Sequence, residues 1–206
     1  EGETGKLPIF AQGVGKVAID SSDTQITDDG NTNQKIQYIT IPTTASTIQV
    51  YDTDDTTVLR TVKVEHICEP KHTPYKVTFV NKYGAYQDLY FFKTTKESFD
   101  LNDEKFKRNI IDTDALTYNF YERQEGRYNI KAKTKIELNT GFVLEDMNST
   151  IEELFLSENV WIRFNNQTLP VNAIDKQLQL KTSLNDKLAN YTVRFEFAFN
   201  KINDVR

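Results

Sequence analysis

The sequence predicts a mainly β fold of antiparallel β-sandwich or barrel-like modules, with one short α-helix at about residues 145–157. Several segments rich in Thr, Val and Ile alternate apolar and polar residues with period two, which is the pattern of half-buried strands. The gaps between these segments are turn-sized. Because parallel pairs need crossovers of about a dozen residues or more, we expect the strands to pair in an antiparallel manner. About ten strands are expected on this basis.

Residues 1–66 are expected to form an N-terminal β module. Its strands are predicted within "KIQYITIP", "TIQVYD" and "TVLRTVKVEH", and the loop Asp52–Thr57 ("DTDDTT") is predicted to close a hairpin. The segment "ICEPKHTP" contains two prolines and is expected to link this module to a second one, residues 67–206. Whether the first module folds separately or shares a sheet with the second stays open.

The second module opens with "VTFVNKYGAYQDLYFF", two apolar runs around Asn81–Gly84. Gly84 tolerates a positive φ and Asn81 can bond its own backbone, so we expect a turn between two strands. The second strand has aromatic residues on both faces and is expected to be covered on both sides. A polar segment follows, from residue 93 to 113, in which no strand is expected.

The longest alternation in the chain is "GRYNIKAKTKIELNTG", which we expect to be a strand that ends at Gly141. One face is predicted to hold Tyr128, Ile130, Ala132, Thr134, Ile136 and Leu138. Helical spacing then predicts the helix, from Leu144, Met147, Ile151, Leu154 and Phe155. Ser149 and Glu152 have the spacing of a capping box, which would start the helix later. Strand regions in "NVWIRFN", "LPVNAID" to "QLQLKT", and "NYTVRFEFAFN" complete the module.

Composition excludes several classes of function. The net charge of −5 over 206 residues argues against a general nucleic-acid or anionic-membrane binder, which needs a basic surface. No apolar run approaches the roughly 20 residues of a membrane span, and no secretory signal is recognisable. The single cysteine, Cys68, excludes an internal disulfide framework and fits assembly in a reducing cytoplasm.

Motifs for chemistry are weak. His66, Cys68 and His72 give three of the four ligands that a zinc site usually needs, so a buried cysteine between surface histidines is the favoured interpretation. The acidic loops lack the complete pattern of a calcium-binding loop. No catalytic motif is present, so we expect no enzyme and no catalytic, cofactor-binding or metal-binding residues. A hydrolase with a dispersed site is a third alternative.

The stretch Val77–Phe92 resembles a module in structural proteins of tailed bacteriophages of Bacteroidota, including crAss-like phages. The matching positions are Asn81, Lys82, Tyr83, Gly84, Asp88, Tyr90 and Phe92. The ordered series "LNTGFVLEDMNSTIEELFLSENVWI", "LPVNAID" and "LQLKTSLNDKLANYTVRFEFA" is also similar, so the resemblance covers about residues 74–200. The family pattern often has Trp before the Asn, where this chain has Val80.

The resemblance implies a non-enzymatic virion structural protein, a subunit of a homo-oligomeric ring, collar or tail assembly around the DNA conduit. Its partners would be copies of itself and neighbouring portal, tail or collar proteins, with no specific nucleic acid, membrane, small-molecule substrate or cofactor. It would be assembled in the host cytoplasm and reside in the neck or tail of the virion. The turn and interface candidates are Asn81, Tyr83, Gly84, Asp88, Tyr90, Phe92, Gly141 and Trp161.

A second function fits the same composition. Aromatic side chains on β-strands can form a stacking surface for sugars, so the alternative is an extracellular β-sandwich module of a Bacteroidota surface protein that binds a carbohydrate or another ligand. It would use an exposed Tyr or Trp161.

Overall fold

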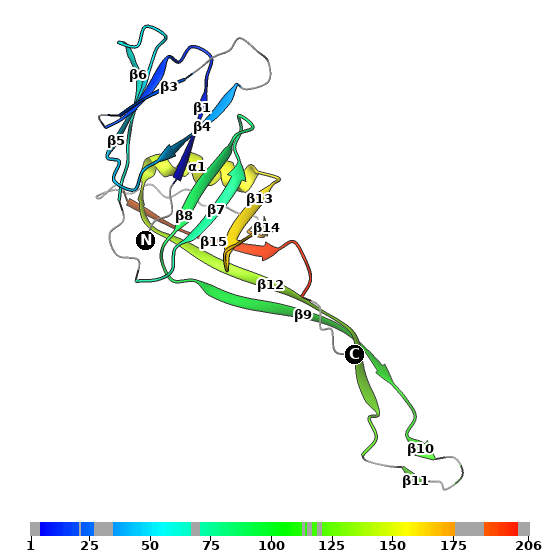
Figure 1. Ribbon diagram of the computed structural model, residues 1–206. Coiled ribbons are helices and arrows are strands. Elements are labelled where there is room, and N and C mark those ends of the chain that lie inside the picture. The colour runs from blue at the N-terminus through cyan, green and yellow to red at the C-terminus, as the bar shows by residue number, and fades with distance from the viewer. Residues whose placement is uncertain are drawn as a thin grey trace.

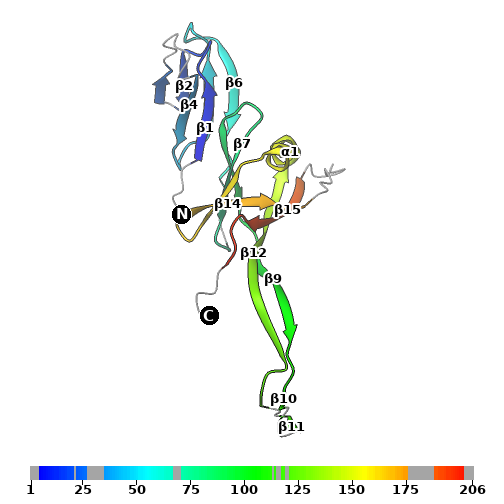
Figure 2. The same ribbon diagram turned by 90° about the vertical axis from the view of Figure 1, so that its right-hand side faces the viewer.

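The protein is an elongated, mainly β molecule whose described residues contain one short α-helix, which confirms the predicted fold class (Figure 1). The computed structural model describes residues 5–20, 22–26, 35–66, 71–112, 114, 117–118, 121–175 and 188–201. The chain forms two small sheets, a large sheet and a long two-stranded ribbon. Figures 1 and 2 show the small sheets at one end, the large sheet with the helix in the middle, and the ribbon projecting from the other end.

The two small sheets draw all their strands from residues 5–63. Strands β1 (Gly5–Phe10) and β4 (Ile36–Ile41) pair with each other. The other sheet has the order β3-β2-β5-β6, made of β2 (Lys16–Ile19), β3 (Ser22–Gln25), β5 (Thr47–Tyr51) and β6 (Val58–Lys63). The two small sheets enclose a separate hydrophobic core, which contains Ile9, Ala11, Val14, Val17, Ile19, Ile26, Ala45 and Ile48.

The loop between β5 and β6 is the predicted hairpin loop. The Asp54 carboxylate accepts hydrogen bonds from the backbone N–H groups of Thr56 (2.9 Å) and Thr57 (2.8 Å) and from the Thr57 hydroxyl (2.6 Å). Hydrogen bonds to the charged form favour it, so the bonds from Thr57 and Thr56 hold the pKa of Asp54 far below its usual value. The Asp54 carboxylate therefore stabilises the turn itself.

The large sheet has seven antiparallel strands, all from residues 75–197, in the order β8-β7-β13-β14-β15-β12-β9. They are β7 (Tyr75–Val80), β8 (Tyr86–Phe91), β9 (Lys96–Lys107), β12 (Glu125–Leu144), β13 (Val160–Phe164), β14 (Gln167–Ala173) and β15 (Leu188–Phe197). The sheet curls until the Lys93 N–H bonds the Asn139 carbonyl oxygen at 3.3 Å, which brings the end of β8 against β12. The result is a partly closed, barrel-like body.

The helix begins with a 3-10 turn (Glu145–Met147) and continues as α1 (Asn148–Leu156), so the expected helix is confirmed to within about a residue. Ile151 and Leu154 are fully buried in the core of the large sheet, together with Phe79, Phe91 and Phe195. The predicted capping box is wrong. The Ser149 hydroxyl donates to the Asp146 carbonyl oxygen, and α1 begins at Asn148 without a side-chain cap.

Two expectations about β12 are also wrong. The strand does not end at Gly141 but runs through it to Leu144, with a bulge between Asn139 and Phe142. Asn139 folds the bulge locally, because its side-chain oxygen accepts the Gly141 N–H at 2.7 Å. The residues "NTG" are typical of a turn, and here they form a bulge inside the strand rather than its end.

A second bulge on β12 changes the predicted face. Ala132, Ile136 and Leu138 are buried on one face as expected, but the register shifts between Tyr128 and Lys131. Asn129 takes φ +51° there, a conformation that Asn tolerates better than most residues. Tyr128 then pairs with Glu104, on the face opposite to Ala132 and its partner Leu101.

The polar segment 93–113, in which no strand was expected, contains the twelve-residue strand β9. Its outer part and the matching part of β12 form the ribbon seen in Figure 1. We call residues 99–134 the arm. Short strands β10 (Ile111–Asp112) and β11 (Thr117–Tyr118) pair near its tip. At about 3.3 Å per residue, β9 alone spans roughly 40 Å.

Candidate assembly surfaces

The β7–β8 turn, residues 81–85, is held by Asn81 through both its backbone and its side chain. The Asn81 N–H donates to the Ala85 carbonyl at 2.9 Å, and the Gly84 N–H donates to the Asn81 carbonyl at 2.9 Å. The Asn81 side-chain oxygen accepts the N–H groups of Tyr83 and Ala85, both at 3.0 Å. Gly84 takes φ +78°. The expected turn is thus present, and its part in assembly stays a prediction.

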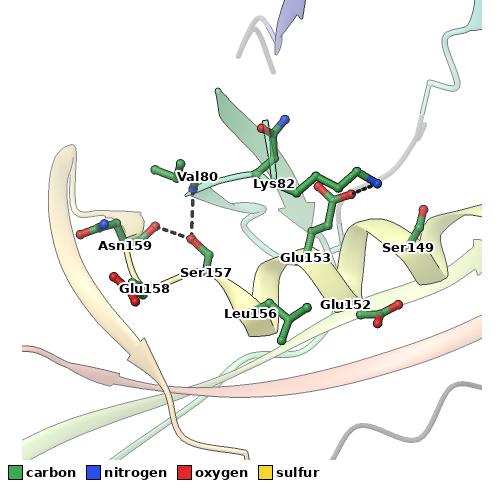
Figure 3. Close-up of a pocket in the computed structure, with 10 residues that line it drawn as sticks. Val80, Lys82, Ser149, Glu152, Glu153, Leu156, Ser157, Glu158 and Asn159 are labelled. Atoms are coloured by element: carbon green, nitrogen blue, oxygen red, sulfur yellow. Dashed lines mark hydrogen bonds and ion pairs between the residues drawn. The ribbon is translucent and has the colours of Figure 1, made fainter. Parts of the chain in front are cut away.

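This turn lies over α1. Figure 3 shows the Lys82 ammonium reaching down to the Glu153 carboxylate, an ion pair of 3.1 Å. The Val80 N–H donates to the Ser157 hydroxyl at 3.2 Å, which in turn donates to the Asn159 carbonyl at 3.1 Å. Between turn and helix lies an open groove of about 540 Å³ (Figure 3). The turn is therefore fixed to the helix, and the groove between them has defined walls.

On the other side of the turn, Tyr83 projects into solvent beside the N-terminal sheets. Its side chain helps to line a mostly apolar hollow of about 400 Å³, together with Pro8, Ile9, Phe10, Ile36, Asn81 and Ala85. The turn thus stands between the small sheets and the helix, with an apolar hollow on one side and the groove on the other.

Trp161 and Tyr86 form an aromatic group with Tyr38, which sequence reasoning missed. The Trp161 and Tyr86 rings meet edge to face with 5.7 Å between their centroids, and the centroids of Tyr86 and Tyr38 lie 6.5 Å apart. The Tyr86 N–H donates to the Tyr38 hydroxyl at 2.9 Å. Because Tyr38 comes from β4 and Tyr86 from β8, this group joins the small sheets to the body. No short-range signal in the sequence links residues that far apart.

Asp88 lies beside this aromatic group. Its carboxylate accepts the Thr78 hydroxyl at 2.7 Å and pairs with the Lys76 ammonium at 2.9 Å, across the β7–β8 pair. Together with Lys6, Tyr38 and Tyr86 these residues line a small hollow of about 280 Å³. The predicted residue Asp88 therefore lies among polar side chains, next to the rings of Tyr38 and Tyr86.

Phe92 and Gly141 meet, although they are far apart in sequence. Gly141 takes φ +72°, and a Cβ added there would lie 2.6 Å from the Phe92 ring. Along β8, Leu89 and Phe91 are buried and Tyr90 is half-buried, so both faces are at least partly covered, as expected. Phe92 is covered here by the chain's own β12 bulge.

Opposite charges bridge the two strands of the arm. Arg127 binds the Asp103 carboxylate with two hydrogen bonds, of 2.9 and 3.0 Å, and Lys107 pairs with Glu125 at 2.9 Å. The Arg127 guanidinium lowers the pKa of Asp103, and the Lys107 ammonium lowers that of Glu125. Cross-strand pairs of this kind stabilise a ribbon that has little burial.

Large apolar side chains stand exposed along the arm. Phe99 exposes 61% of its surface and Tyr121, near the tip, exposes 98%. The others are Leu101, Phe106, Ile111, Tyr128 and Ile130. Sequence reasoning missed this surface, although Phe99 and Leu101 flank Asp100, whose charge complements the lysines of "KAKTK". That complementarity was the available signal.

The histidines are engaged separately. The His66 ring nitrogen lies 2.6 Å from the Ala45 carbonyl oxygen, and the His72 ring nitrogen 3.3 Å from the Thr94 hydroxyl. Cys68 lies outside the described residues. Within the described ranges, no three His, Cys, Asp or Glu side chains gather as a metal site would require. No helix of the described chain is long and apolar enough to cross a membrane.

Comparisons with protein-family models, with curated proteins and with solved structures found no match to this chain.

Proposed function

We propose that this chain is a structural subunit of a tailed-phage virion, one that assembles with copies of itself into a ring, collar or tail assembly around the DNA conduit. The observation that carries the proposal is the arm. A two-stranded ribbon is at best marginally stable in water by itself. This one projects from the body with exposed aromatic and aliphatic side chains, from Phe99 to Tyr121. We expect a neighbouring subunit to bury these exposed side chains.

Cyclic assembly suits such a shape. A ring of identical subunits is closed by heterologous contacts, in which one surface of each copy meets a different surface of the next. An arm that reaches away from its own body supplies one of these two surfaces (Figure 2). The resemblance of Asn81–Phe92 to phage structural modules supports the same assignment, and a net charge of −5 suits a wall that must not hold DNA.

The proposal is tested by mass measurement and electron microscopy of the purified chain and of virions. We expect a closed oligomer of the chain and density for it in the neck or tail. A matched variant replaces residues 100–131 with a short turn, which removes all of the arm except its base and leaves the buried core residues in place. We expect this variant to fold and to stay monomeric. A wild-type chain that stays monomeric and has no place in a virion would refute the proposal.

One observation favours the second candidate, a carbohydrate-binding module. The hollow beside Tyr38 and Tyr86 combines aromatic rings with the Asp88 carboxylate, the two kinds of group that sugar sites use. A broad glycan array tests it. Binding that is lost in Tyr86→Ala, and kept in the control Tyr83→Ala, would support this candidate. An array without signal would count against it.

A further inference from the structure

The outward face of α1 is acidic and uncovered. Glu152 and Leu156 lie four residues apart and therefore on one side of the helix, where Figure 3 shows them turned away from Lys82. Leu156 exposes 76% of its surface, a large apolar group at the rim of the groove. Between residues 145 and 158 the sequence has five carboxylates and no Lys, Arg or His.

The end of the helix adds to this negative field. The C-terminus of a helix has a partial negative charge, which a cation stabilises, and the last turn of α1 contains no basic residue. Glu158 is exposed just beyond it. Within the described part of the chain, only Glu153 of the groove carboxylates has an ion-pair partner, Lys82. Glu152 and Glu158 thus leave the groove with an excess of negative charge and an exposed leucine.

One face of the arm has the opposite excess. Leu101, Asp103, Lys105 and Lys107 alternate onto the same side of β9. Lys105 stands directly opposite Arg127, and like charges in that position destabilise a strand pair. The nearby carboxylates Asp103 and Glu125 form their ion pairs with Arg127 and Lys107, and among the described residues none forms an ion pair with Lys105. This face therefore offers an exposed cation and, farther along the same strand, an exposed leucine.

We propose that this face of the arm of one copy docks in the groove between α1 and the β7–β8 turn of the next copy. Lys105 would meet Glu158, just beyond the negative end of the helix, and Glu152, one turn before Leu156, and Leu101 would cover Leu156. The arm points away from its own α1 in both ribbon views, so it cannot fill the groove of its own chain (Figures 1 and 2). An arm that fills this groove must therefore come from a second copy. This inference rests on the proposed oligomeric assembly.

Charge reversal tests the pairing in the full chain. Lys105→Glu, and Glu152→Lys combined with Glu158→Lys, should each raise the concentration needed for assembly by about tenfold or more, because like charges then face each other. The triple variant, which swaps the signs, should restore assembly. Asp146→Lys, at the other end of the helix, and Lys63→Glu, on β6, are matched controls that should assemble like the wild type. Circular dichroism verifies that each variant folds.

A zero-length carbodiimide cross-link gives a second readout on the unmodified protein. In a mixture of isotope-labelled and unlabelled chains, we expect Lys105 linked to Glu152 or Glu158, with one peptide from each kind of chain. A wild-type chain that does not assemble and has no place in a virion would refute the proposed function. A chain that assembles but tolerates both reversals, or whose triple variant is not restored, would overturn the docking site alone.

Discussion

Replacing Gly141 with alanine should destabilise the body through two separate effects. Alanine at position 141 must adopt a left-handed backbone conformation, which costs about 1–2 kcal/mol for an L-residue. Its Cβ would also lie 2.6 Å from the Phe92 ring, and overpacking of this kind costs typically about 1–3 kcal/mol. We therefore expect Gly141→Ala to lower the free energy of unfolding by about 2–5 kcal/mol.

Gly84 supplies the matched control for the backbone effect. It takes φ +78°, but a Cβ there would have no heavy atom within 4 Å. Gly84→Ala should therefore cost only the backbone strain, about 1–2 kcal/mol. The stiffer Gly84→Val should cost about 1–3 kcal/mol. The difference between the two alanine variants isolates the clash with Phe92.

Urea denaturation followed by the fluorescence of Trp161, the single tryptophan, measures these free energies in the body. A second test adds Phe92→Leu to Gly141→Ala. If the clash is real, the double variant should be more stable than the sum of the two single effects predicts. Equal destabilisation by Gly141→Ala and Gly84→Ala would refute the close packing of Phe92 on the bulge.

Two further predictions concern buried and paired groups. The Thr140 hydroxyl is fully buried and accepts the Tyr191 N–H at 3.0 Å, so Thr140→Val should lower the free energy of unfolding, measured with urea, by about 1–3 kcal/mol. Thr192→Val, at an exposed position, is the control, and equal effects of the two substitutions would contradict the role of burial. Arg127 holds the pKa of Asp103 in the folded arm below its usual, unfolded-state value. The ion pair therefore stabilises the arm fully when the pH is above the unfolded-state pKa, and this contribution is lost as the pH falls through the lower, folded-state pKa. Titration of the Asp103 carboxyl carbon by nuclear magnetic resonance should show the low pKa and its rise in Arg127→Gln; an unchanged pKa would exclude the pair as its cause.

The body was largely predictable because burial leaves a period in the sequence. In β7, Val77 and Phe79 alternate into the core, and in α1 the buried Ile151 and Leu154 follow helical spacing. In these elements the apolar residues alone show which face is buried. The turn at Asn81–Gly84 was also predictable, since its conformation depends on the two residue types that favour it.

The arm was not predictable by the same rule. The residues of β9 are exposed on both faces almost throughout, so no buried face imposes a period on them. The strand is held by pairing and charge complementarity with β12, which is a relation between two distant segments. The bulges at Asn129 and Asn139 were missed for a related reason, because each depends on the register with a neighbouring strand.

The candidate surfaces divide in the same way. Tyr83 and Asp88 were identified from one continuous stretch, whereas Tyr38 joins Tyr86 only through the fold. The groove needs both the β7–β8 turn and α1, two elements that Lys82 and Glu153 connect. Surfaces composed of several segments become visible only when the chain is folded.

The most direct test of the account is the mass of the full chain in solution, measured across a range of concentrations beside the variant without residues 100–131. The account predicts one closed oligomer for the full chain and a folded monomer for the variant. A full chain that is monomeric at every concentration, or an oligomer that forms equally well without the arm, would contradict it.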